Sequence, residues 1–275
     1  MWSNLAALVR HRGLIQSLVV RDLKARYRGS ILGFFWSFVN PLLLLSIYTF
    51  VFEHILPNRE TATVPYAVFQ FCGLLPWTWF SASLLEASGS LISGGNLIKK
   101  VLFPAEVLPI VSVLANMVHF CLGLTILAGF MIWYGHYPEW DEFIWFPVIV
   151  LVQLVFTTGL GLILSALTVH FRDIRDLLSN LLTFWFFATP IIYFYKMPSV
   201  AAFGWLFNLN PFFHLAVSYQ EVLFFYRSPA DPPPAFPTAF GHIWWLLALG
   251  GASVLLFLLG YWVFDRLRDS FSEAV

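Results

Sequence analysis

Seven stretches of this chain run for about 20 residues or more with no charged side chain, and six of them are candidate membrane spans. A helix of that length crosses the roughly 30 Å hydrocarbon core of a bilayer. Hydrophobic residues make up 59% of the chain and charged residues only 11%, whereas a soluble domain has roughly 45–50% and 25%. Because one core cannot bury such an apolar excess, we predict an all-α integral membrane protein with six transmembrane helices. The predicted spans are residues 31–52, 66–85, 107–134, 143–169, 177–195 and 243–264.

A seventh uncharged run, residues 197–220, is interrupted by Pro198, Gly204 and Pro211. A lipid-exposed helix broken in this way would leave backbone groups without hydrogen-bond partners. We therefore predict a re-entrant external hairpin over 197–226, shielded by protein, before the last span.

The positive charges predict the orientation, since short loops rich in Lys and Arg stay in the cytoplasm. With six spans and a cytoplasmic N-terminus, all of the 15 Lys and Arg except Arg59, Lys196 and Arg227 fall on the cytoplasmic side. The sequence thus predicts one transmembrane domain over 31–264, a cytoplasmic tail over 265–275 and both termini in the cytoplasm.

Residues 1–30 are predicted to contain a cytoplasmic amphipathic helix that lies in the membrane interface. Its apolar positions recur at three- and four-residue steps, and basic residues occupy the opposite face. Such a helix brings its basic groups to the depth of lipid phosphates.

The motifs that would give this chain its own chemistry are absent from the sequence. It contains no phosphate-binding G-x-x-x-x-G-K-[ST] loop and no metal-ligating H-E-x-x-H or C-x-x-C pattern. Among the histidines and the charged residues, only His119 lies well inside a predicted span. The formal net charge is zero, so the chain has no overall positive field that would attract nucleic acid. We therefore predict no catalytic residue, no metal ligand and no cofactor in this chain, and expect any energy source to reside in a partner.

Several short motifs along the chain together resemble the permease subunits of type-2 ABC exporters of lipid-linked polysaccharide, of the O-antigen and teichoic-acid type. The first is the basic run RDLKARYRGSILGFFW at residues 21–36, which leads into Asn40-Pro41-Leu42. The others are NLIKKVLFP at 96–104, HFRDIRD at 170–176, TPIIY at 189–193 and NLNPF at 208–212.

This resemblance implies a non-enzymatic, channel-forming subunit in the bacterial inner membrane. Two copies would pair around a translocation path, and two cytoplasmic ABC ATPase subunits would bind ATP and Mg²⁺ and hydrolyse the ATP. The substrate would be a polyprenyl-pyrophosphate-linked glycan. The resemblance also places the contact with the ATPase in the two cytoplasmic loops, at Asn96, Leu97, Lys99, Lys100, Phe103, Pro104, Arg172, Asp173 and Arg175.

Two sets of residues are predicted to meet such a substrate. Basic groups at head-group depth, with a glycine-rich entry to the first span, would hold the pyrophosphate: Lys24, Arg26, Arg28, Gly29 and Gly33. Aromatic faces bind sugar rings weakly at many equivalent places, and aromatic residues are enriched between Phe184 and Tyr226. From this stretch we predict a glycan path lined by Tyr193, Tyr195, Trp205 and Phe212.

Two other classes of membrane protein remain open at this point. One is an ion-driven secondary transporter or flippase. The other is a polyprenyl-linked membrane glycosyltransferase, which would need acidic metal-binding clusters. The loop with Glu139, Asp141 and Glu142 is the one candidate for such a cluster.

Overall fold

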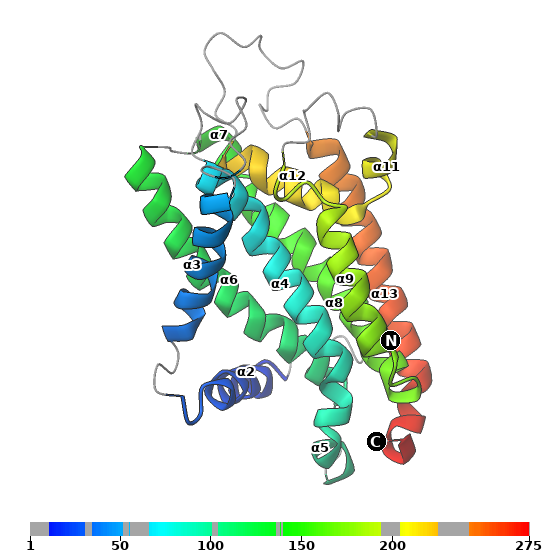
Figure 1. Ribbon diagram of the computed structural model, residues 1–275. Coiled ribbons are helices and arrows are strands. Elements are labelled where there is room, and N and C mark those ends of the chain that lie inside the picture. The colour runs from blue at the N-terminus through cyan, green and yellow to red at the C-terminus, as the bar shows by residue number, and fades with distance from the viewer. Residues whose placement is uncertain are drawn as a thin grey trace.

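A computed structural model describes residues 11–30, 35–51, 55, 66–100, 104–135, 138, 140–193, 204–224 and 242–274. Within these residues every regular element is a helix, which confirms the all-α prediction (Figure 1). The helices are α2 (Arg12–Arg26), α3 (Trp36–Phe50), α4 (Tyr66–Ser93), α5 (Gly95–Lys100), α6 (Val107–Tyr134), α7 (Trp140–Phe143), α8 (Phe146–His170), α9 (Ile174–Phe187), α11 (Gly204–Asn208), α12 (Pro211–Leu223) and α13 (Ile243–Ala274).

Four of the described helices are long and apolar enough to cross a membrane: α4, α6, α8 and α13. The predicted spans 31–52 and 177–195 correspond to α3 and α9, whose described helices hold 15 and 14 residues. The structure thus agrees with a membrane protein and accounts for four of the six predicted spans by length.

Helix α4 lies at the centre of the bundle and is the most buried of the four, with 78% of its apolar window buried. It packs against α6 and α8, and α8 packs closely on α13. Glycines permit this last contact, because a Cβ on Gly159 would lie 2.9 Å from the Phe257 backbone and one on Gly260 would lie 2.5 Å from the Gly159 carbonyl oxygen. Small residues at such crossings are how membrane helices approach closely.

Helix α9 ends at Phe187, eight residues before the predicted end of the fifth span. Pro190 has no amide hydrogen with which to continue the helix. The Asn210 side chain also holds this end of α9: it accepts from Trp185 Nε1 at 2.6 Å and donates to the Ala188 carbonyl oxygen at 3.2 Å. Its oxygen accepts from the first amides of α12 as well, so that Asn210 caps α12 and connects it to α9.

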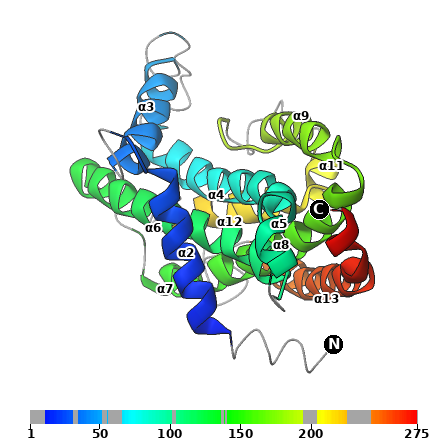
Figure 2. The ribbon, with the colours of Figure 1, turned by 90° about the horizontal axis from the view of Figure 1, so that it is seen from below.

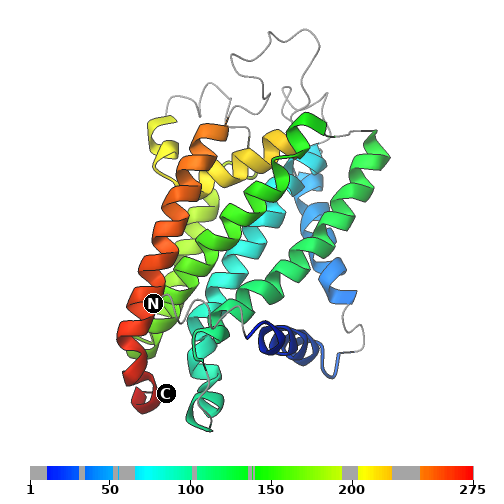
Figure 3. The same cartoon turned by 180° about the vertical axis from the view of Figure 1, so that it is seen from behind.

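The two ends of the bundle carry different short elements (Figures 1 and 3). Helices α2 and α5 lie at one end together with the C-terminal part of α13, and α7, α11 and α12 lie at the other. Helix α12 lies across that second end and is buried over almost its whole length. Most of the predicted hairpin is thus α11 and α12, while 197–203 and 225–226 fall outside the described residues.

The described parts of both predicted cytoplasmic segments contain helix that packs on the bundle. Leu18 of α2 is buried against Val107 and Val111 of α6, with Leu14, Ile15 and Val19 beside it, so the apolar side of α2 covers the end of α6. The C-terminal residues, predicted as a tail from 265, continue α13 to Ala274, where Phe271 packs against Phe264.

Candidate functional site

Helix α4 carries one stripe of partly exposed residues on an otherwise buried surface. Between Val68 and Leu91 every residue outside the stripe is buried. The stripe residues recur at helical spacing, and all but Leu85 are polar or small: Thr78, Ser81, Ala82, Leu85, Glu86 and Gly89. Because lipid-facing helix surfaces are apolar and a carboxylate in a membrane helix is costly, this stripe is suited to a protein-lined path.

Three cavities open along the stripe. A lateral groove of about 370 Å³ lies between α4 and α9 and reaches Thr78 and Ser81. An apolar cavity of about 300 Å³ lies among α2, α3, α4 and α6 and reaches Thr78 and Ala82. A cationic cavity of about 480 Å³ lies among α2, α4, α6 and the start of α9 and reaches Glu86 and Gly89. Their sizes fall in or near the range of roughly 300–1,000 Å³ typical of small-molecule sites.

The Arg26 guanidinium lies in the wall shared by the apolar and cationic cavities and connects α2 to α4 and α6. Its Nε and Nη2 donate to Asp22 Oδ2 at 2.9 and 2.7 Å. Its Nη1 and Nη2 donate to Glu86 Oε1 and Oε2 at 2.8 and 2.5 Å. Asn116 completes the cluster, because its Oδ1 accepts from Arg26 Nη1 at 3.1 Å and its Nδ2 donates to Glu86 Oε2 at 2.6 Å.

The charge of Arg26 is balanced within the protein. Burial disfavours the charged guanidinium, but the Glu86 and Asp22 carboxylates outweigh burial and raise the pKa of Arg26 above its ordinary value. An incoming phosphate would have to compete with two carboxylates for this side chain. The predicted role of Arg26 as a pyrophosphate ligand therefore stays a prediction, and the structure gives the residue a role in joining three helices.

Tyr27 and His119 form a second polar contact beside this cluster. His119 Nδ1 lies 3.1 Å from the Ala115 carbonyl oxygen, which can only accept, so Nδ1 carries the proton. His119 Nε2 then accepts from the Tyr27 hydroxyl at 2.5 Å. Both ring nitrogens of the one histidine deep in a span are therefore occupied within the protein.

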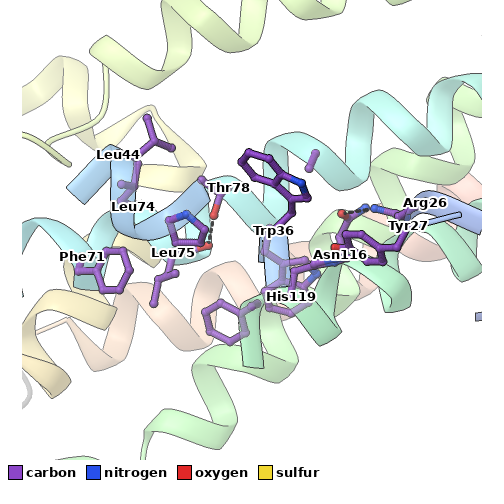
Figure 4. A pocket seen from close by; sticks show the side chains of 14 residues that line it. Arg26, Tyr27, Trp36, Leu44, Phe71, Leu74, Leu75, Thr78, Asn116 and His119 are labelled. Atoms are coloured by element: carbon purple, nitrogen blue, oxygen red, sulfur yellow. Dashed lines mark hydrogen bonds between the residues drawn. The ribbon is translucent and has the colours of Figure 1, made fainter. Parts of the chain in front are cut away.

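Figure 4 shows that polar and apolar side chains line different ends of the apolar cavity. Arg26, Tyr27, Asn116 and His119 gather at one end of it, and the aliphatic and aromatic side chains of α3 and α4 occupy the other. The cavity therefore has one polar end and an apolar body.

The remaining residues predicted to hold pyrophosphate lie near the end of α2. The Lys24 and Arg28 side chains are exposed. Gly29 has a left-handed φ of +80°, which explains the glycine at the turn that follows α2. Gly33 lies outside the described residues.

The residues predicted to contact an ATPase separate into two groups. Asn96, Arg172 and Asp173 are exposed at the α2 and α5 end of the bundle. Arg175 is exposed too and also lines the cationic cavity, whereas Leu97 packs against a buried cluster that includes Tyr261. Pro104 is half-buried, nothing is described for the side chains of Lys99 and Lys100, and Phe103 lies outside the described residues.

The residues predicted to line a glycan path are dispersed. Trp205 is exposed on α11, and the Tyr193 hydroxyl donates to the Phe187 carbonyl oxygen at 3.1 Å. Phe212 is 0% exposed and packs edge-on against Trp77, with the two ring centroids 4.9 Å apart. Its ring therefore offers no surface to a substrate in this conformation. Tyr195 lies outside the described residues.

The sequence predicts the pairing of Arg26 with Asp22, four residues before it, and the structure confirms that pair. Sequence reasoning missed the α4 stripe and the two distant partners of Arg26, Glu86 and Asn116. Glu86 was expected just beyond the end of a span, whereas α4 continues to Ser93 and places Glu86 opposite Arg26. The signal that could have revealed the stripe was its spacing at three- and four-residue steps, through Thr78, Ser81, Ala82, Leu85, Glu86 and Gly89.

Comparison with known proteins gives matches along most of the chain. A family profile described as "ABC-2 type transporter" matches residues 13–224. The O-antigen export system permease protein RfbA of Myxococcus xanthus is 39% identical over 269 residues, which cover 98% of this chain and 97% of that protein. An O-antigen export system permease protein RfbA of Klebsiella pneumoniae is 30% identical over 264 residues, 94% of each chain. The polysialic acid transport protein KpsM of Escherichia coli is 22% identical over 216 residues, 76% of this chain and 80% of that protein.

Proposed function

The chain belongs to the ABC-2 type transporter family, and we propose that it is the membrane permease subunit of an ATP-driven exporter of lipid-linked polysaccharide of the O-antigen type. The names of its full-length relatives support this substrate class, since they are permeases of O-antigen export systems. The more distant relatives are named for capsule polysaccharide export and polysialic acid transport.

The α4 stripe is the structural observation that carries the proposal. Helix α4 lies between α3 and α9 (Figures 1 and 2), and the lateral groove that reaches the stripe at Thr78, Ser81 and Leu85 is lined by all three helices. A polar polymer needs a path that binds it weakly at many places, and a stripe of hydroxyls and small side chains meets that need better than an apolar wall.

Two copies of the chain would close this path. The outer surfaces of α3 and α9 on either side of the stripe carry exposed apolar residues: Leu43, Ile47 and Phe50 on α3, and Leu177, Leu181 and Phe184 on α9. We propose that a homodimer places two α4 stripes face to face, and that α3 and α9 also cross the membrane and give six spans per chain. The chain would then span the inner membrane of a bacterium. Its α11 and α12 hairpin would lie at the external surface, and both of its termini would lie in the cytoplasm.

An ABC ATPase would supply the energy from the end of the bundle that carries α2 and α5. At that end α5 and the turn between α8 and α9 project together (Figure 1). We propose that two ATPase subunits, which bind ATP and Mg²⁺, dock on these elements. The substrate would be a glycan on polyprenyl pyrophosphate, and its pyrophosphate would be attracted by the exposed Lys24 and Arg28.

Charge reversal in the two projecting elements is expected to release the ATPase. In a Lys99→Glu, Lys100→Glu and Arg172→Glu triple variant, co-purification of the ATPase with the permease should fall about tenfold or more, because like-charge contacts at an interface cost several kcal/mol. The measurement is the ATPase-to-permease ratio after affinity purification from detergent-solubilised membranes.

The matched control reverses Arg59 and Lys196, which charge patterning assigns to the opposite side of the membrane. An unchanged ATPase ratio in the triple variant, with normal membrane insertion, would contradict the proposed docking surface.

A further inference from the structure

The apolar and cationic cavities are adjacent, since Arg26 lines both, but they differ in chemistry. The cationic cavity is lined by three arginines, Arg21, Arg26 and Arg175, against two carboxylates, Asp22 and Glu86. Both carboxylates are bound to Arg26. The positive charge available to a ligand therefore belongs to Arg21 and Arg175.

These two arginines come from different elements and reach the same space. Arg21 projects from α2, and Arg175 from the start of α9 lies against α4, where a Cβ on Gly89 would be 3.7 Å from its Nη1. Within the described part of the chain neither guanidinium has a hydrogen bond or an ion pair. Ser90, Ser93 and Ser112 line the same cavity, and their hydroxyls donate to carbonyl oxygens of their own helices. One guanidinium group can donate two parallel hydrogen bonds to the oxygens of a phosphate, so this space is suited to a phosphate or diphosphate.

The apolar cavity on the other side of Arg26 has a different lining. Apart from its polar end it is walled by Trp36, Leu44, Phe71, Leu74 and Phe120 from α3, α4 and α6. Water gains few hydrogen bonds in such a space, whereas an apolar chain would fill it favourably. The environment therefore changes from cationic, around Arg21 and Arg175, to apolar, around these side chains.

We propose that the two cavities form one site for a phosphate-headed lipid: Arg21 and Arg175 bind the phosphate groups, and the apolar cavity takes the adjoining part of the chain. The site rests on the proposed function, which names its occupant as the isoprenoid diphosphate that carries the glycan. An anionic phospholipid of the bilayer shares the same chemistry, a phosphate on an apolar chain. Arg26, paired with Asp22 and Glu86, forms the wall between head group and chain and does not itself bind the phosphate.

Photolabelling tests the site independently of transport. The full chain is placed in nanodiscs of zwitterionic phosphatidylcholine and irradiated with a farnesyl diphosphate that carries a benzophenone on its chain, and the labelled peptides are identified by mass spectrometry. We expect labelling of α3, α4 or α6 at residues around the apolar cavity. An Arg21→Gln and Arg175→Gln double variant should lose about tenfold in labelling, because charge-assisted hydrogen bonds to phosphate are removed.

The matched control is an Arg12→Gln and Arg266→Gln double variant, since these exposed cations line neither cavity and carry no proposed role in binding. Unlabelled farnesyl diphosphate should compete, and farnesol and phosphatidylglycerol at the same concentration should not. Equal loss in both double variants, or labelling spread over the lipid-facing surface, would overturn the site. Equal competition by phosphatidylglycerol would assign it to bulk lipid and overturn its link to the substrate. If the labelling result overturns this site but export still depends on the chain, the lipid site is wrong and the proposed transport function still holds.

Discussion

An Arg26→Ala variant is expected to lose most export activity, and removal of Glu86 in the same chain is expected to restore a large part of it. The single substitution takes the guanidinium away from the Glu86 carboxylate and the Asn116 amide oxygen, so that the carboxylate keeps the Asn116 amide donor but loses its counter-ion among three helices. Because both ionic side chains are partly exposed, we expect a destabilisation of about 1–3 kcal/mol, below the cost of breaking a fully buried pair. An Arg26→Ala and Glu86→Leu double variant removes both charges and should recover stability.

This comparison distinguishes two roles for Arg26: joining α2 to α4 and α6, or binding the pyrophosphate of the substrate. Export and thermal unfolding of the purified protein in detergent are measured for wild type, both single variants and the double variant, as a double-mutant cycle. Arg28→Ala, at an exposed cation two residues away, serves as the control and should unfold at the wild-type temperature. If the double variant is stable but exports no better than Arg26→Ala, Arg26 contacts the substrate and our assignment is wrong.

Bulky side chains on the α4 stripe are expected to block export while the protein still folds. In Ser81→Trp and Ala82→Trp variants the indole would fill the space beside the stripe, and export should fall below about a tenth of the wild-type rate, since a translocation path fails when it is constricted. Both residues are only partly buried, so the larger side chain can turn toward the open side of α4 without displacing core residues. The measurement is surface polysaccharide in cells that make normal amounts of the permease and its ATPase complex.

The control for this prediction is Leu255→Trp, on the exposed surface of α13, where Leu255 is 70% exposed. That variant should export at the wild-type rate. Full export by both stripe variants, or an equal loss in the Leu255→Trp variant, would show that the stripe does not line the path.

Local composition was enough to predict much of the fold. The long uncharged runs identify α4, α6, α8 and α13, because apolarity over about 20 residues is a property of neighbouring residues. The end of α9 was placed too late in the sequence: Pro190 is a local signal for it, but the contact of Asn210 with Ala188 comes from 22 positions away. No local pattern reports that second contribution.

The site was less accessible to sequence reasoning for the same reason. The basic run before the first span is visible in the sequence, but which cation is free depends on contacts across the fold: Glu86 neutralises Arg26 from 60 positions away, and Arg175 joins Arg21 in one cavity. Aromatic enrichment likewise did not distinguish packing from lining, since Phe212 is buried and Trp205 is exposed.

The central claim is that this chain moves a lipid-linked glycan out of the cytoplasm, and the location of that glycan tests it most directly. The gene is deleted in the bacterium that carries it, and lipid-linked polysaccharide is measured at the cell surface and inside the inner membrane. The account predicts loss of the surface polymer and accumulation of its polyprenyl-pyrophosphate-linked form inside, both reversed by the wild-type chain and not by the Ala82→Trp variant. Surface polysaccharide at the wild-type level in the deletion strain would contradict it.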